Sequence, residues 1–215
     1  MSNLKPIIYV VDDDPSVLKT TQALLSSDYW EVICLSDAAR FMDVYRPEHP
    51  GCLVLDLQMP EISGLELQQT LVEWNMDIPI VFITGGASVK TTVTAMKAGA
   101  QDFIEKPFTR ETLVHTVQAA LRSQAVRRQE KQQLEAANQR FKSLTEREWE
   151  VLNSMVSGPS ILSSKEVARE LNISHRTVEH HRARIIEKTQ CPSLSELIRL
   201  ASFIGIANPN LPVDS

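Results

Sequence analysis

The first 121 residues alternate five short apolar runs with longer amphipathic stretches, and this alternation restricts the fold more than any other feature. Most of the runs are β-branched or aliphatic and nearly continuous, as in parallel strands buried on both faces. They are Ile7–Val11, Glu31–Leu35, Cys52–Leu55, Ile80–Ile83 and Asp102–Ile104. Helical stretches follow them near residues 15–27, 37–45, 64–74, 88–98 and 110–121. Five such units predict an α/β domain over residues 1–121 with a doubly wound five-stranded parallel sheet.

The rest of the chain has a helical pattern. Residues 122–141 contain neither Pro nor Gly, which predicts a helical linker. Leu134, Ala137, Phe141 and Leu144 have the spacing of a short coiled-coil seam, although a solvated connecting helix explains the segment equally well. Residues 142–207 are expected to form an all-α domain of four helices, and residues 208–215 a disordered tail.

Start signals divide this second domain into its helices. Thr145 precedes Glu148, and Ser163 precedes Glu166, by the three positions of a capping box. A short second helix, Lys165–Leu171, is joined by a tight turn to a basic third helix at about 175–188. This order is typical of a helix-turn-helix. The fourth helix is expected at about Leu194–Ile204.

Charge is distributed unevenly along the chain. Residues 1–121 carry 8 Lys and Arg against 16 Asp and Glu, whereas residues 142–215 carry 9 against 9. Because an acidic half repels phosphate backbones, contacts with nucleic acid are expected from the second half. No apolar stretch is long enough to span a membrane, the first residues lack a secretory pattern, and the three cysteines are scattered. These features favour the reducing cytoplasm.

Polar residues gather where the predicted strands end. In chain order they are Asp12, Asp13, Asp14, Asp56, Thr84 and Lys106. The carboxyl ends of parallel strands meet at one edge of the sheet, where ligands bind. Clustered carboxylates repel one another unless a cation neutralises them, and oxygen ligands favour Mg²⁺ over zinc. An aspartate can act as a nucleophile toward phosphorus, and a lysine and a hydroxyl can stabilise the phosphoryl oxygens.

Each of these residues also has an ordinary structural interpretation. The aspartate run can cap the following helix, and Asp14 is expected to do so. Asp56 can be a loop carboxylate, Thr84 a strand-end hydroxyl and Lys106 a surface lysine. The combination favours a phosphoryl site, because a lone Asp after a buried strand costs free energy without a partner.

Four segments together resemble a known family. VVDDD, DLQMPEISG, FITGG and DFIEKPF, in this order over about residues 7–121, are similar to the flavodoxin-like receiver domain of bacterial two-component response regulators. The resemblance implies that Asp56 is the phosphoacceptor. It also implies that Asp12, Asp13 and Asp56 hold Mg²⁺ together with the backbone carbonyl of Gln58. Ile62 stands where Met is frequent, a mild departure.

The same resemblance assigns three further roles. Thr84 and Lys106 would each bind a phosphoryl oxygen. Phe103 occupies the position of an aromatic switch residue, although a core phenylalanine is the alternative. The Lys106–Pro107 bond is expected to be cis.

The second half resembles another domain. LTEREWEVL followed by KEVARELNISHRTVEHHRARIIEK is similar to the LuxR-type helix-turn-helix of NarL/FixJ-type regulators, closest to the FixJ-like branch, over about residues 143–205. There the third helix would enter the major groove of DNA. Helical spacing predicts that Val178 and Ile185 are buried with Ile186 beside them. His181 is expected to pack within the domain. Two departures are a turn at 158–164 that is longer than usual and Thr189 in place of Leu.

The remaining residues of this third helix are candidates for DNA contacts, with a solvated face as the alternative for each arginine. For base edges or nearby contacts they are Glu179, His180 and Arg182. For the DNA backbone they are Arg176, Thr177, Arg184 and Lys188.

Together the resemblances imply a transcription regulator rather than an enzyme. A cognate sensor histidine kinase would phosphorylate it, after which it would form a homodimer, bind promoter DNA and act on RNA polymerase, without a membrane partner. One alternative is an enzyme that hydrolyses phosphate esters at the acidic site. Another is a regulator whose first domain only binds proteins, whether phosphorylated or not.

Overall fold

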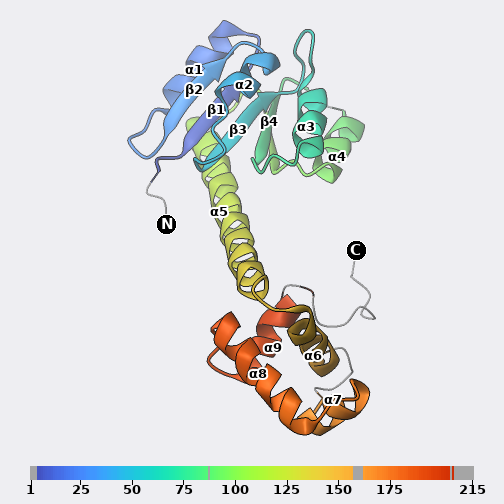
Figure 1. Ribbon diagram of the computed structural model, residues 1–215. Helices are drawn as coiled ribbons and strands as arrows, with labels where there is room; N and C mark the ends of the chain where they lie inside the picture. The colour runs from blue at the N-terminus through green and yellow to red at the C-terminus, as the bar shows by residue number, and fades with distance from the viewer. Residues whose placement is uncertain (1–3, 87, 157–161, 204, 206–215) are drawn as a thin grey trace. The chain divides into compact units, whose positions relative to one another are not determined.

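The computed structural model describes residues 4–86, 88–156, 162–203 and 205. The chain divides into two compact units, Met1–Arg128 and Gln129–Ser215. The first is the expected α/β domain and the second the expected helical domain (Figure 1). The first unit extends beyond residue 121, the end expected from the sequence. None of the helices in the described ranges is long and apolar enough to cross a membrane.

The first unit contains the five predicted strands in one parallel sheet. They are β1 (Ile7–Val11), β2 (Glu31–Leu35), β3 (Gly51–Asp56), β4 (Ile80–Thr84) and β5 (Asp102–Glu105). Their order is β2-β1-β3-β4-β5. In the register, Val11 pairs with both Leu35 and Leu55, so β1 lies between β2 and β3. This order reverses direction at β1 and β3, and ligands bind beyond the strand ends at such a point.

Helices cover both faces of the sheet because successive strand residues point to opposite sides. Ile7, Tyr9 and Val11 belong to the core under α2 (Ala38–Val44), α3 (Gly64–Glu73) and α4 (Val89–Lys97). Ile8 and Val10 belong to the core under α1 (Pro15–Leu25) and the first part of α5 (Arg110–Phe141). The central strands β1, β3 and β4 are therefore buried along their whole length, and the doubly wound fold is confirmed.

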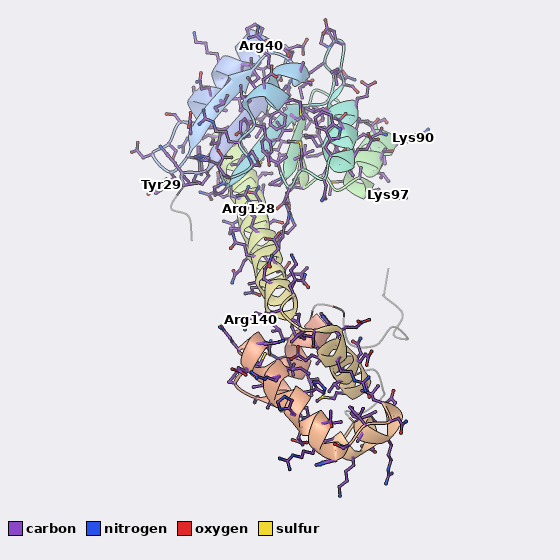
Figure 2. The ribbon with its side chains drawn as sticks, in the orientation of Figure 1. Tyr29, Arg40, Lys90, Lys97, Arg128 and Arg140 are labelled. Atoms are coloured by element: carbon purple, nitrogen blue, oxygen red, sulfur yellow. The ribbon has the colours of Figure 1, made fainter. Side chains whose placement is uncertain are left out.

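Helix α5 contains both the last expected helix of the α/β domain and the expected linker. Arg127 and Arg128, near its middle, are bonded to other elements of the first unit. The guanidinium of Arg128, which is labelled in Figure 2, donates to the backbone carbonyls of Pro47, Glu48 and His49 at 2.6–3.2 Å. Arg127 pairs with Asp77 at 3.1 Å. These contacts explain why the compact unit ends several residues later than the sequence pattern indicates.

The second unit contains α6 (Glu146–Val156), α7 (Ser164–Glu170), α8 (His175–Thr189) and α9 (Leu194–Phe203). Both predicted capping boxes form: Glu148 accepts from the Thr145 backbone N–H at 2.7 Å, and Glu166 accepts from that of Ser163 at 2.7 Å. Residues 158–161 of the long turn, Ile204 and the expected tail at 208–215 lie outside the described residues.

Part of the apolar spacing at the end of the linker is explained within this unit. Phe141 and Leu144 are buried in the core formed by α6, α7, α8 and α9. Ala137 is also buried, whereas Leu134 is exposed. Packing against the unit's own helices thus accounts for Phe141 and Leu144, the last two residues of that spacing.

Candidate functional site

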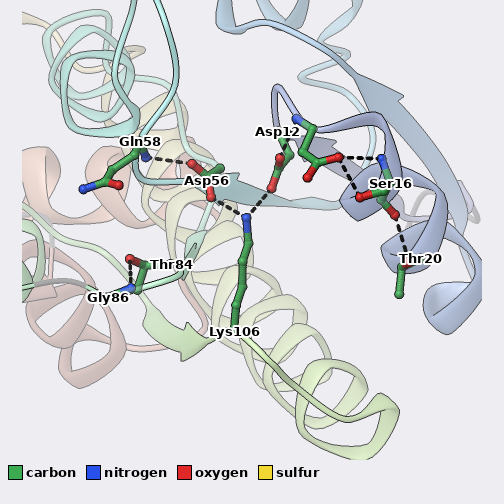
Figure 3. A network of polar contacts seen from close by, with 9 residues as sticks. Asp12, Ser16, Thr20, Asp56, Gln58, Thr84, Gly86 and Lys106 are labelled. Atoms are coloured by element: carbon green, nitrogen blue, oxygen red, sulfur yellow. Dashed lines mark hydrogen bonds and ion pairs between the residues drawn. The ribbon is translucent and has the colours of Figure 1, made fainter.

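The strand ends bring the predicted acidic residues together at one edge of the sheet. Asp56 is the last residue of β3, Asp12 follows β1 directly, and Lys106 follows β5 (Figure 3). Asp12 and Thr84 are buried, and Asp56 is only 6% exposed. The parallel strands β1 and β3 are adjacent, so their carboxyl ends place Asp12 and Asp56 side by side.

The ammonium of Lys106 lies between the two carboxylates. Its Nζ donates to Asp12 Oδ2 at 2.7 Å and to Asp56 Oδ1 at 2.6 Å. Burial alone lowers the pKa of Lys106, but the hydrogen bonds and charges of Asp12 and Asp56 outweigh it and raise that pKa. Burial also raises the pKa of Asp12, and the hydrogen bonds from Lys106 and the Asp14 backbone oppose it. One cation therefore offsets the repulsion between two desolvated carboxylates.

Backbone donors fix the orientation of this pocket. The Gln58 backbone N–H donates to Asp56 Oδ2 at 2.7 Å, so each oxygen of Asp56 has a donor. The Asp14 backbone N–H donates to Asp12 Oδ1 at 2.9 Å. Thr84 Oγ1 accepts from the Gly86 backbone N–H at 3.2 Å. The hydroxyl of Thr84 is thus held at the end of β4.

The aspartate run divides into residues with different surroundings. Asp12 lies in the pocket, Asp13 is exposed, and Asp14 caps α1 by accepting from the Ser16 backbone N–H at 2.8 Å. Hydrogen bonds from Ser16 lower the pKa of Asp14. The expected capping role of Asp14 is confirmed. Within the described ranges, no three His, Cys, Asp or Glu side chains are grouped as a metal site.

Two other motif residues shape the same edge. Phe103 is half-buried and stacks on Phe82, with ring centroids 5.0 Å apart. Gly64 is buried beneath the site, and a Cβ there would overlap the backbone carbonyl oxygen of Asp56. Only glycine fits that approach. The Lys106–Pro107 bond is cis, as expected.

Helix α8 carries the predicted DNA-contacting residues. Val178 and Ile185 are buried and Ile186 is partly buried, as the spacing predicts. His181 is half-buried. Ser174 caps the helix and accepts from the Thr177 backbone N–H at 3.0 Å. The exposed candidates on the helix are Arg176, Glu179, His180 and Arg184, whereas Thr177, Arg182 and Lys188 are half-buried.

Three of the candidate cations on α8 have partners within the second unit. Arg184 pairs with Glu187 at 3.0 Å, and Arg182 with Glu179 at 2.9 Å. Lys188 donates to Glu148 at 2.7 Å. In the described part of the chain, Arg176 is the candidate cation for which no ion pair is seen.

Glu148 has a second role that the sequence does not indicate. Besides capping α6, this buried carboxylate pairs with Lys188 on α8 and so joins the two helices. Burial by itself raises the pKa of Glu148, but the hydrogen bonds from Lys188 and Thr145 lower it to about 2. The capping-box spacing identified the local bond to Thr145. It gave no signal for the distant Lys188, because that contact depends on how α6 packs on α8.

Comparisons with known proteins match both units. The receiver domain family of response regulators matches residues 8–118, and the luxR family of bacterial regulatory proteins matches residues 142–201. The response regulator TodT of Pseudomonas putida is 38% identical over 200 residues, covering 93% of this chain and 87% of TodT. The transcriptional regulatory protein FixJ of Azorhizobium caulinodans is also 38% identical, covering 93% of each chain.

Two solved structures are similar to this chain over most of its length. The response regulator StyR is 42% identical with a TM-score of 0.79, covering 92% of this chain and 98% of its own. Full-length FixJ from B. japonicum is 37% identical with a TM-score of 0.56, covering 96% of this chain and 100% of its own.

Proposed function

Because this chain belongs to the NarL/FixJ-type response regulators, which join a receiver domain to a LuxR-type DNA-binding domain, we propose that Asp56 accepts a phosphoryl group from a cognate sensor histidine kinase. The chain is a transcription regulator rather than an enzyme. The observation that carries the proposal is the pocket in which Asp56 Oδ1 contacts Lys106 Nζ at 2.6 Å and Oδ2 contacts the Gln58 backbone N–H at 2.7 Å.

In the transfer, an oxygen of the Asp56 carboxylate attacks the phosphorus of a phosphohistidine. The new O–P bond forms an acyl phosphate while the N–P bond of the kinase breaks and its electron pair returns to the imidazole. Lys106 and Thr84 bind oxygens of the transferred group, whose negative charge is the charge that this step must stabilise. Phe103, stacked on Phe82 beside β4, then responds to the changed bonding of Thr84.

A divalent cation fits the chemistry of the pocket. Asp12, Asp13, Asp56 and the backbone carbonyl of Gln58 offer oxygen ligands only, which suits Mg²⁺. The pocket already binds one positive charge, the Lys106 ammonium, against two buried carboxylates. When bound, Mg²⁺ supplies positive charge next to the phosphoryl oxygens. Of these three aspartates, Asp13 is the one exposed to solvent.

The second unit is proposed to bind promoter DNA through α8 in the major groove. His180 and Glu179 are exposed toward solvent and suit base edges, whereas Arg176, Thr177 and Arg184 suit the phosphate backbone. The sequence places Lys188 among the candidates for contacts with the DNA backbone, whereas in the structure its ammonium pairs with Glu148 at 2.7 Å. Phosphorylation is proposed to favour a homodimer that binds paired half-sites and acts with RNA polymerase in the cytoplasm.

The test of phosphoacceptance is substitution of Asp56. Asp56→Asn in the full chain should abolish acid-labile phosphate uptake from a small phosphodonor with Mg²⁺ present. Asp43→Asn, on the exposed side of α2, is a matched control that should label like the wild type. Full labelling of the Asp56 variant would refute the assignment.

DNA binding is tested separately. Affinity for duplex DNA should fall steeply and linearly on a log–log plot against salt, because Arg and Lys release counterions from phosphates. A flat response counts against a groove-bound basic helix. Equal DNA binding with and without phosphorylation would instead favour a receiver that acts only through protein contacts.

A further inference from the structure

Arg182 lies at the centre of a small polar cluster that joins α8 to α7. Its Nη1 donates to the hydroxyl of Ser164 and, at 2.9 Å, to Oε1 of Glu179. Ser164 is the buried first residue of α7, and Glu179 lies one turn before Arg182 on α8. The two helices pack against each other. One side chain therefore links the start of one helix of the helix-turn-helix to the middle of the other.

The guanidinium of Arg182 has few donors left for DNA. A bidentate contact with guanine uses two adjacent N–H donors, either Nε with Nη2 or Nη1 with Nη2. Nη1 is engaged by Ser164 and Glu179. Nε is buried and has no hydrogen-bond partner among the described residues. Each of these two donor pairs therefore includes one nitrogen that is already hydrogen-bonded or is buried. The side chain of Arg182 is only 24% exposed.

The charge of Arg182 is also balanced locally. The hydrogen bond from Ser164, followed by the charge of Arg182, lowers the pKa of Glu179 and keeps this carboxylate ionised. Arg176, six residues before Arg182 on the same helix, is exposed. A paired cation attracts a phosphate less than an unpaired one, so it contributes less to the salt dependence of DNA binding.

We propose that Arg182 is a positioning residue: it holds α8 on the start of α7 through Ser164, keeps Glu179 in place, and contacts neither a base edge nor a phosphate. This proposal rests on the proposed binding of DNA by α8. It replaces the expectation that Arg182 is a base-reading residue. A recognition helix contributes affinity only when its supporting contacts fix its orientation, and Arg182 supplies such a contact.

The test compares three variants of the full-length chain, Arg182→Gln, Ser164→Ala and the double variant, with Arg176→Gln. The probe is a duplex enriched by the wild-type chain from a randomised library, and affinity is measured by fluorescence anisotropy over a range of KCl concentrations. Arg182→Gln should weaken binding about tenfold, the factor expected for a hydrogen bond to a charged group. Ser164→Ala should weaken it in the same direction, and the double variant no more than Arg182→Gln, because the two residues act as one unit.

The slope of affinity against salt separates positioning from contact. For Arg182→Gln and Ser164→Ala the slope should equal that of the wild type, whereas for Arg176→Gln it should decrease by about one phosphate contact. A decrease of that size for Arg182→Gln would overturn the proposal in favour of a phosphate contact. A changed preference at one base pair in Arg182→Gln, with Ser164→Ala unaffected, would overturn it in favour of base reading.

A measurement without DNA tests the clamp itself, that is, the contact between Arg182 and Ser164 that holds α8 on α7. Amide hydrogen exchange at the start of α7 should accelerate in both Arg182→Gln and Ser164→Ala, while α9 exchanges as in the wild type. Unchanged exchange at α7 in both variants would contradict the clamp. If the wild-type chain bound no duplex, the proposed function would fail, yet the exchange result would still decide whether Arg182 clamps the two helices.

Discussion

The side chain of Gln124 joins helix α5 to the start of β3 and to the segment that precedes β4. Its Oε1 accepts from the backbone N–H of Gly51, the first residue of β3, at 2.7 Å, and its Nε2 donates to the carbonyl of Asp77 at 2.8 Å. Gln124 is buried although it lies in a segment whose sequence is typical of a solvated linker. This contact and those of Arg128 make residues 122–128 part of the receiver unit.

Gln124→Ala should therefore destabilise the receiver. The substitution leaves a buried N–H and a carbonyl without their partner, which costs about 1–3 kcal/mol. Thermal or urea unfolding of the full chain would measure the loss. Gln129→Ala, in the same helix but exposed, should change stability by no more than about 0.5 kcal/mol. Equal stabilities for the two variants would show that the Gln124 contacts contribute nothing.

Gly64→Ala should distort the acidic pocket, because Gly64 packs against the backbone of Asp56. The added methyl overlaps the Asp56 carbonyl oxygen and lies 3.0 Å from the ring of Phe82, so either α3 or β3 must shift. Overpacking of this kind costs about 1–3 kcal/mol. Phosphate uptake should also slow, since Asp56 moves. A Cβ at Gly85 meets open space, so Gly85→Ala is the stability control. A Gly64 variant as stable as this control would contradict the close approach.

Lys106→Met should change how the pocket responds to magnesium. Without the ammonium, Asp12 and Asp56 are two buried carboxylates with no cation between them, and the receiver should lose roughly 3 kcal/mol in EDTA. Excess MgCl₂ should restore more stability to this variant than to the wild type, because the ion no longer competes with a bound ammonium. The readout is the shift in unfolding temperature between EDTA and MgCl₂.

The matched control is Lys97→Met, which removes an exposed lysine of α4 (Figure 2). Its magnesium-dependent shift should equal that of the wild type. If the magnesium-dependent shift of Lys106→Met were no larger than that of Lys97→Met, this would argue against a position shared by Mg²⁺ and the Lys106 ammonium.

Glu148→Gln should weaken the helical unit in a pH-dependent way. The folded pKa of Glu148 is about 2, below its ordinary value of 4.5, so the ionised carboxylate stabilises the folded state above about pH 5. That stabilisation disappears as the pH falls toward 2. At neutral pH the variant should lose roughly 1.5–3 kcal/mol, the range for hydrogen bonds to a charged group. The difference from the wild type should shrink as acid is added.

Trp149 in α6 provides the signal for this measurement, in a background where Trp30 and Trp74 are replaced by Phe. Urea unfolding would be followed by fluorescence at several pH values. Glu150→Gln is the control, because Glu150 is exposed and pairs with Arg147 at the surface. A Glu148 difference that persisted unchanged at low pH would contradict the assigned pKa.

The sequence by itself determined the features that depend on local order along the chain. Five apolar runs followed by helices predicted the doubly wound sheet, since strands buried on both faces must be apolar throughout. The ends of those runs predicted that Asp12, Asp56, Thr84 and Lys106 meet at one edge, because parallel strands align their carboxyl ends. Capping at Thr145 and Ser163, and burial of Val178 and Ile185, follow from spacing within one helix.

The tertiary structure alone decided the contacts between residues far apart in sequence. Lys106 bridging two carboxylates, Gln124 bonded to Gly51, Glu148 paired with Lys188 and Arg182 tied to Ser164 all join separate elements. A helical pattern shows which face of a helix is polar. It does not show which distant group meets that face, because this depends on how whole elements pack. The roles of the long linker and of the cations of α8 are therefore visible only in the tertiary structure.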